Sequence, residues 1–143
     1  MDKQLLEAKL NQLLHILKET EGWLDVSLED FSRDTKLVRA VQRNLQLLVE
    51  YASDMNGILV LEAGDKAPGS YRESFTVVFG MDFAAALTEN ERAALLASVD
   101  WRNDLIHEYE PEESDEVFFG KLKDFLIAYG KYARIIHEYY RSR

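Results

Sequence analysis

Two of the three histidines in this chain lie in the same tetrapeptide, Ile-His-Glu-Tyr, which occurs at 106–109 and again at 136–139. Histidine is the side chain whose ordinary pKa, about 6.5, suits proton transfer near neutral pH. The first copy is preceded by Arg102 and Asn103, five and four residues before His107. It therefore combines a group that can transfer a proton with a planar guanidinium that can bind two phosphate oxygens.

The second copy lacks this combination. Ala133 stands four residues before His137, and the nearest preceding arginine, Arg134, is three residues away. The segment then ends in Tyr-Tyr-Arg-Ser-Arg, and cations are favoured at the C-terminal end of a helix by its dipole. We therefore predict a functional site at the first copy and an ordinary helix end at the second.

Helical geometry limits how the first copy can work. At about 100° per residue, Asn103 and His107 lie one turn apart, so the amide can orient the imidazole. On the same scale Arg102 and Tyr109 are nearly in line, whereas Arg102 and His107 diverge by roughly 140°. A single straight helix cannot direct Arg102 and His107 at one atom. We expect either a second copy of the helix across a two-fold axis or a distortion at the helix end.

A lone arginine or histidine on a helix is usually a surface or packing residue, so the context decides. Here Arg-Asn-x3-His-x-Tyr precedes an acidic turn and a predicted long terminal helix that begins "DEVFFGKLKDF" (115–125), and "YRESF" (71–75) and the helix at 39–54 add to the pattern. Together these features resemble the HEPN superfamily over nearly the whole chain. They resemble most closely its HepT group, whose motif is Arg-x4-His-x-Tyr.

The resemblance implies a toxin of a type VII-like toxin–antitoxin pair, an endoribonuclease that works as a homodimer without a metal ion or cofactor. His107 would transfer the proton, Arg102 would bind the phosphate, and Asn103 would fix the imidazole tautomer or contact the phosphate. It also implies a partner antitoxin, a nucleotidyltransferase that transfers AMP from ATP onto Tyr109. That group would add bulk and negative charge beside Arg102; the alternative for Tyr109 is a half-buried aromatic residue at the helix end.

Composition and charge set outer limits. The chain has 143 residues, a formal net charge of −9 and no cysteine, which excludes disulfides, thiolate metal sites and a cysteine nucleophile. The N-terminus is not signal-like and no apolar run approaches the roughly 18–20 residues of a membrane span. We therefore expect a cytoplasmic protein with neither a membrane nor a DNA partner, since net acidity disfavours bulk attraction to nucleic acid.

The acidity is concentrated beside the first tetrapeptide. Eight of the 26 acidic residues fall within 100–116, with Arg102 as the only base there. These carboxylates would repel RNA if they lined its cleft. They could instead contact a basic partner surface or its magnesium nucleotide, or form a solvated turn and a helix start. The sequence leaves these alternatives open.

Other polar residues carry weaker predictions. Arg39 and Arg43 form an i,i+4 pair that could contact phosphate, although solvated surface is the more common role. Glu50 and Asp54, one turn apart, could pair with arginines of a neighbouring helix and are too sparse for a metal site. His15 stands between leucine and isoleucine on a leucine-rich helix, which favours packing over chemistry.

Apolar residues recur at helical spacing almost throughout, so we predict a single all-α domain over residues 1–143, an up-and-down bundle of four main helices plus a short one. Helices are expected at about 2–21, in a short stretch after Ser27, at 34–61, from 71 to 80–83, from 88 to Pro111, and from 114 to 140. The first helix should bury Leu6, Leu10, Leu13, Leu14 and Leu17 and end at Gly22. We expect no second domain.

Two other functions are compatible with such a fold. One is a non-catalytic HEPN-like binding module that holds substrate for a separate nucleotidyltransferase, although relatives of that kind commonly lack the Arg–His pair. The other is a plain dimerisation bundle without a site, which predicts that the face at 102–109 is buried or scattered in solvent instead of lying in a cleft.

Overall fold

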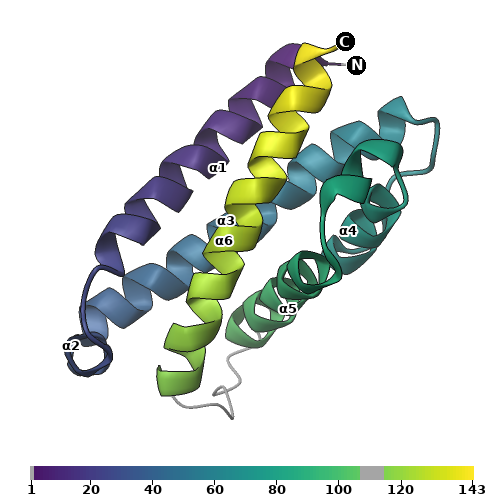
Figure 1. The fold of residues 1–143 in the computed structure, drawn as a ribbon. Helices are drawn as coiled ribbons and strands as arrows, with labels where there is room; N and C mark the ends of the chain where they lie inside the picture. Colours follow the sequence, from purple (N-terminus) through teal and green to yellow (C-terminus); the bar gives the residue numbers. More distant parts are fainter. Residues whose placement is uncertain (1, 107–114) are drawn as a thin grey trace.

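The computed structural model describes residues 2–106 and 115–143, and all regular structure in these ranges is helical. Figure 1 shows an elongated bundle of four long helices: α1 (Lys3–Trp23), α3 (Thr35–Glu62), α5 (Glu89–Ile106) and α6 (Asp115–Arg141). Two shorter helices, α2 (Leu28–Arg33) and α4 (Tyr71–Phe79), and the 3-10 segment η1 (Asp82–Ala86) complete it. The predicted all-α bundle is confirmed, and its short elements are more numerous than expected.

The helices begin where local side chains cap them. The Ser27 hydroxyl accepts the Asp30 amide at 3.1 Å, as its spacing predicted. At the start of α5 the Thr88 hydroxyl accepts a hydrogen bond from the Glu91 amide at 3.1 Å, and the Glu91 carboxylate accepts one from the Thr88 amide at 2.8 Å. This is a capping box, in which two donors without helical partners are satisfied reciprocally. Helix α1 runs one residue past Gly22, the expected stop, to Trp23.

The leucine stripe of α1 forms part of the core. Four of the five leucines assigned to it are buried, Leu6, Leu10, Leu13 and Leu17, but the prediction was wrong for Leu14, which is 41% exposed. Leu14 lies roughly 60–80° from the centre of that stripe, at its edge. The packing role expected for His15 was also wrong: its side chain is 77% exposed, near Glu19, on the opposite face of the helix.

Helix α6 is fixed by two buried tyrosines that face different neighbours. The Tyr129 hydroxyl lies 2.7 Å from the Ser98 hydroxyl on α5. The Tyr132 hydroxyl donates to the Asn56 amide oxygen on α3, and the Asn56 amide donates to the Ser74 hydroxyl on α4 at 3.1 Å. Burial raises the pKa of both phenols, so they remain protonated donors. These bonds set the position of α6 against three other helices.

Helix α3 packs against α1, α4 and α5, and α6 packs against both α1 and α5. In Figure 1, α1 and α6 lie side by side and bring the two ends of the chain together, where the Lys3 ammonium donates to the Arg143 carbonyl. Helices α4 and α5 pack against each other and against α3. Within the described ranges, every helix is too short or too polar to cross a membrane.

Candidate functional site around Arg102

Arg102, near the end of α5, is held by groups from three parts of the chain. Its Nη2 donates to Glu50 Oε1 on α3 and to the Tyr71 hydroxyl on α4, each at 3.4 Å. Its Nη1 donates to the Asn103 amide oxygen at 3.2 Å. The guanidinium carbon stands 4.4 Å from the centroid of the Tyr71 ring, in cation–π geometry. Only 15% of the arginine side chain is exposed, so its head group has a defined orientation.

Tyr71 is placed by the start of its own helix. Ser70 caps α4 by accepting a hydrogen bond from the Glu73 amide at 3.0 Å, and the Glu73 carboxylate accepts one from the Gly69 amide at 3.1 Å. These two bonds fix the turn that enters the helix, and Tyr71 is its first residue. The loop before α4 therefore determines where the aromatic ring meets Arg102.

The guanidinium borders a groove of about 980 Å³ between α1, α3 and α4. The groove is lined mainly by small and polar side chains, and three cations reach it: Lys9 from α1, Arg72 from α4 and Arg102 from α5. Asp54 is its only carboxylate among the lining residues that the structure describes. The lining residues themselves thus include three cations and one carboxylate.

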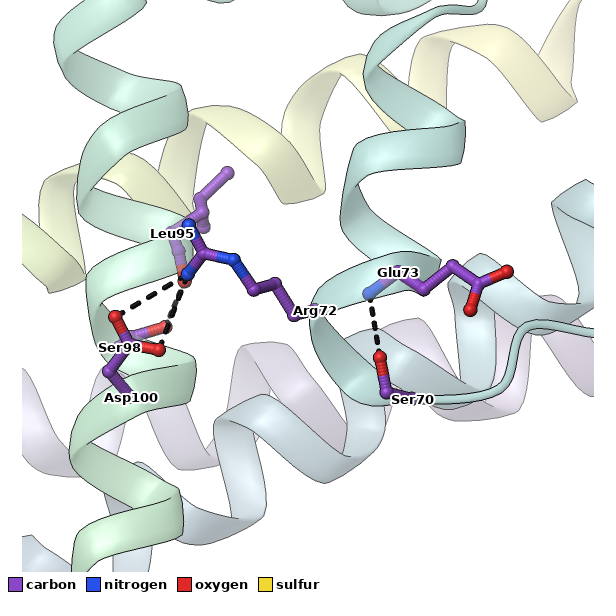
Figure 2. Close-up of polar contacts among 6 residues, drawn as sticks. All are labelled: Ser70, Arg72, Glu73, Leu95, Ser98 and Asp100. Carbon is purple, nitrogen blue, oxygen red and sulfur yellow. Dashed lines mark hydrogen bonds and ion pairs between the residues drawn. The ribbon is translucent and has the colours of Figure 1, made fainter.

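Each of these cations already has a carboxylate partner. Lys9 contacts Asp54 at 3.1 Å, and Arg102 contacts Glu50 at 3.4 Å. Figure 2 shows Arg72 extending from α4 to Asp100 on α5, where its Nη1 lies 3.3 and 3.4 Å from the two carboxylate oxygens. Asp100 belongs to the acidic stretch noted in the sequence, and the structure thus gives one of its carboxylates a structural role between two helices.

The structure brings together only some of the predicted site residues. Arg102 and Asn103 both line the groove. His107 and Tyr109 lie outside the described residues, so the expected Arg–His pairing stays a prediction. Arg39 and Arg43 are exposed on α3, do not line the groove, and Arg43 donates to Gln46 at 3.2 Å.

Sequence reasoning missed the role of Tyr71 and anticipated that of Glu50 only in part. Glu50 was expected to meet an arginine of a neighbouring helix, and it contacts Arg102. Asp54 was expected to do the same, but its partner is a lysine, Lys9. The one sequence signal for Tyr71 was its place at the start of "YRESF", directly after a proline, a glycine and a capping serine.

The described residues contain no cluster of three or more histidine, aspartate or glutamate side chains that could hold a metal ion. The polar groups around Arg102 instead comprise one carboxylate, one phenol, one amide and the guanidinium itself. This set can hold an anionic oxygen through the arginine and orient it by hydrogen bonds.

Comparisons with known proteins identify the family and the fold of the chain. The model of the HepT-like ribonuclease family matches residues 13–119. The chain belongs to this family, as its motif predicted. No curated protein sequence matches the chain.

Several solved structures share the fold at low sequence identity. A chain of a toxin–antitoxin structure with AMP-PNP is 19% identical, with 95% of this chain and 99% of that chain covered and a TM-score of 0.81. A chain from the complex of a tri-AMPylated Shewanella oneidensis HEPN toxin with its MNT antitoxin is 21% identical, with coverages of 96% and 99% and a TM-score of 0.79. A mutant MntA–HpeT toxin–antitoxin structure gives 20% identity, coverages of 95% and 99%, and a TM-score of 0.79. These similarities establish the HEPN toxin fold.

Proposed function

We propose that this protein is the toxin of a type VII-like toxin–antitoxin pair and cleaves RNA without a metal ion. One observation carries the proposal: the motif arginine on α5 is held at the edge of a cation-lined groove by Glu50 and Tyr71. A fixed guanidinium beside open space can bind the phosphate that is to be cleaved, and membership in the HepT-like ribonuclease family supports this substrate.

The reaction is an internal transfer at phosphorus. A base removes the proton of the ribose 2′-hydroxyl, and the 2′-oxygen attacks the adjacent phosphorus. The bond to the 5′-oxygen then breaks, an acid protonates that leaving oxygen, and a 2′,3′-cyclic phosphate remains. We assign the proton transfers to His107 and the stabilisation of the transition-state charge to Arg102. Asn103 assists by orienting one of these groups, and it contacts Arg102 in the structure.

Helix geometry supports a homodimeric site. Because Arg102 and His107 diverge by roughly 140° on one helix, two copies facing each other would let the arginine of one protomer act with the histidine of its partner. We place Arg39 and Arg43, which are exposed on α3, as further phosphate contacts outside the groove. Charge reversal at either position should weaken RNA binding about equally for all sequences.

Neutralisation would occur at Tyr109. In our proposal the Tyr109 oxygen attacks the α-phosphorus of ATP on the antitoxin, the phenolic proton is lost, and pyrophosphate leaves. The resulting AMP ester would place a phosphate near Arg102 and exclude RNA. Support comes from the solved complex of a HEPN toxin described as tri-AMPylated with its MNT antitoxin, which shares this fold.

The decisive experiment uses unmodified protein purified away from any partner. We expect it to cleave RNA in the presence of EDTA and to leave 2′,3′-cyclic phosphate ends, and we expect Arg102→Ala and His107→Ala to lower the rate by at least about a hundredfold. If the wild type and both variants leave RNA intact while the protein still binds a nucleotidyltransferase tightly, the chain is a non-catalytic binding module instead.

A second experiment tests neutralisation separately. The protein is co-expressed with a candidate nucleotidyltransferase antitoxin, and its intact mass is measured. We expect an increase corresponding to AMP that maps to Tyr109 and is absent in Tyr109→Phe. An unmodified Tyr109 would remove this mechanism and leave the nuclease proposal standing.

A further inference from the structure

We infer that the groove beside Arg102 is a subsite for one nucleotide of the RNA, adjacent to the phosphate that is cleaved. The inference rests on the proposed function and adds a place for the substrate away from the motif. A groove of about 980 Å³ is at the upper end of the range for sites that enclose small ligands, and a nucleotide fits within it.

Unpaired buried polar atoms indicate that the groove is built for a polar ligand. The hydroxyl of Ser53, a residue 7% exposed, and the Nε of Arg102 are buried and have no hydrogen-bond partner among the described residues. Both residues line the groove, although they come from different helices. Leaving a buried polar atom unpaired costs about 1–3 kcal/mol. A ligand with phosphate or ribose oxygens would satisfy these two groups if the side chains that cover them shift on binding, whereas the third such atom, Arg92 Nε, belongs to a residue outside the groove.

The charges favour an anionic ligand over a protein partner. Among the described residues, three cations, Lys9, Arg72 and Arg102, line the groove, and each is paired with a carboxylate that an anionic ligand would have to displace. The centre of a protein interface is usually depleted of charge, so this lining does not resemble one. The ion pair of Arg72 with Asp100 involves half-exposed side chains, and pairs of this kind contribute only about 0–1 kcal/mol. A phosphate can therefore replace Asp100 at Arg72 at little cost.

Gly57 makes the subsite testable without disturbing the fold. It lies in α3 and lines the groove, and a Cβ added to it meets no atom within 4 Å. A leucine there would extend into the groove, and replacing a helical glycine also raises helix propensity by about 1 kcal/mol. Gly120 on α6 offers the matched control: it is exposed, equally open to a Cβ, and does not line the groove.

The experiment measures binding of a 2′-O-methyl RNA hexamer, which lacks the attacking hydroxyl, to the full chain by fluorescence anisotropy. Circular dichroism and light scattering monitor the fold and the oligomeric state of each variant. We expect Gly57→Leu to weaken binding at least about tenfold, Gly57→Ala to have a smaller effect, and Gly120→Leu to bind within about twofold of the wild type.

Ser53→Ala provides a second, independent readout. Because the hydroxyl has no hydrogen-bond partner among the described residues, its removal should leave the unfolding midpoint unchanged or raised, while RNA binding weakens about threefold or more. A merely structural serine would lower stability and leave binding unchanged.

Two results would overturn the inference. In one, folded Gly57→Leu binds the hexamer as the wild type does. In the other, Gly57→Leu changes the oligomeric state with no specific loss of RNA binding, which would make the groove a contact between protein copies. Failure of the proposed nuclease activity would look different: neither the wild type nor Gly120→Leu would cut RNA, yet hexamer binding would still depend on Gly57.

Discussion

The guanidinium of Arg102 lies over the ring of Tyr71, 4.4 Å from its centroid, although the two residues are 31 positions apart in the sequence. The same guanidinium contacts Glu50, which is 52 positions away. Three helices thus meet at one cation, and the orientation of that cation depends on how α3, α4 and α5 pack. This dependence gives the site consequences for activity and for stability that can be measured separately.

Removing the Tyr71 hydroxyl should impair RNA cleavage slightly, and removing the ring as well should impair it more. Tyr71→Phe keeps the ring and loses only the hydroxyl contact at 3.4 Å, so we expect a fall in kcat/KM of about twofold. Tyr71→Leu removes the cation–π contact, which contributes about 1–2 kcal/mol when partly buried, and should lower kcat/KM about tenfold. Equal activity of the two variants would show that the ring does not position Arg102.

Glu50→Gln should separate binding from turnover. The carboxylate competes with an RNA phosphate for the Arg102 guanidinium, so its neutralisation should lower KM about two- to threefold. The guanidinium also loses a charged anchor that is 30% exposed, so kcat should fall about fivefold. Steady-state kinetics on a defined RNA measure both parameters. A raised KM would contradict the competition that we describe.

Tyr132→Phe should destabilise the fold and leave the site chemistry intact. The Asn56 amide oxygen would lose its donor inside the core, and we expect a loss of about 1–3 kcal/mol in the free energy of unfolding, measured by urea denaturation. Tyr140→Phe, a change at a half-buried residue of the same helix, is the control and should change the free energy of unfolding by less than about 0.5 kcal/mol. Equal effects would mean that the buried hydrogen bond contributes nothing specific.

The Glu91 carboxylate gives the fold a dependence on pH. Hydrogen bonds from Lys131 and from the Thr88 amide lower its pKa below the usual 4.5. A lowered folded-state pKa stabilises the native state fully above the ordinary value, and this stabilisation is lost as the pH falls through the lower one.

Glu91→Gln preserves hydrogen bonding at this position and removes the titration. We expect it to cost about 1 kcal/mol at neutral pH, and we expect the difference from the wild type to shrink as the pH falls below the ordinary glutamate pKa of 4.5. Urea denaturation at a series of pH values measures this. A constant difference across that range would show that the charge of Glu91 is immaterial.

What the sequence predicts well is local. The capping bonds of Ser27 and of Thr88 with Glu91 involve residues three positions apart, so composition and spacing are sufficient to specify them. The buried leucines of α1 follow from helical periodicity in the same way. Leu14 marks the limit of that reasoning: a residue at the edge of an apolar stripe is buried only if a neighbouring helix covers it, and at 41% exposure it is not.

The motif residues of the candidate site could be predicted from the sequence, but the side chains that surround Arg102 could not. The motif and its resemblance to the HepT group singled out Arg102 and Asn103, but the groups that hold the arginine, Glu50 and Tyr71, come from other helices. Such contacts depend on the packing of the bundle, which helical periodicity does not predict. The groove itself has no sequence signal, because its lining comes from α1, α3, α4, α5 and the loop before α4.

The paired state of the groove cations has a thermodynamic consequence for salt. A bare lysine or arginine that binds RNA releases counterions condensed on the phosphates, and each such contact steepens the dependence of affinity on ionic strength. If RNA binds as we propose, Lys9, Arg72 and Arg102 would each exchange a carboxylate for a phosphate, and the freed carboxylate would attract a cation in return. The affinity of the groove for RNA should therefore fall less with added salt than it would if the three basic residues were unpaired. We therefore expect this groove to retain its affinity for RNA at ionic strengths at which unpaired basic surfaces lose theirs.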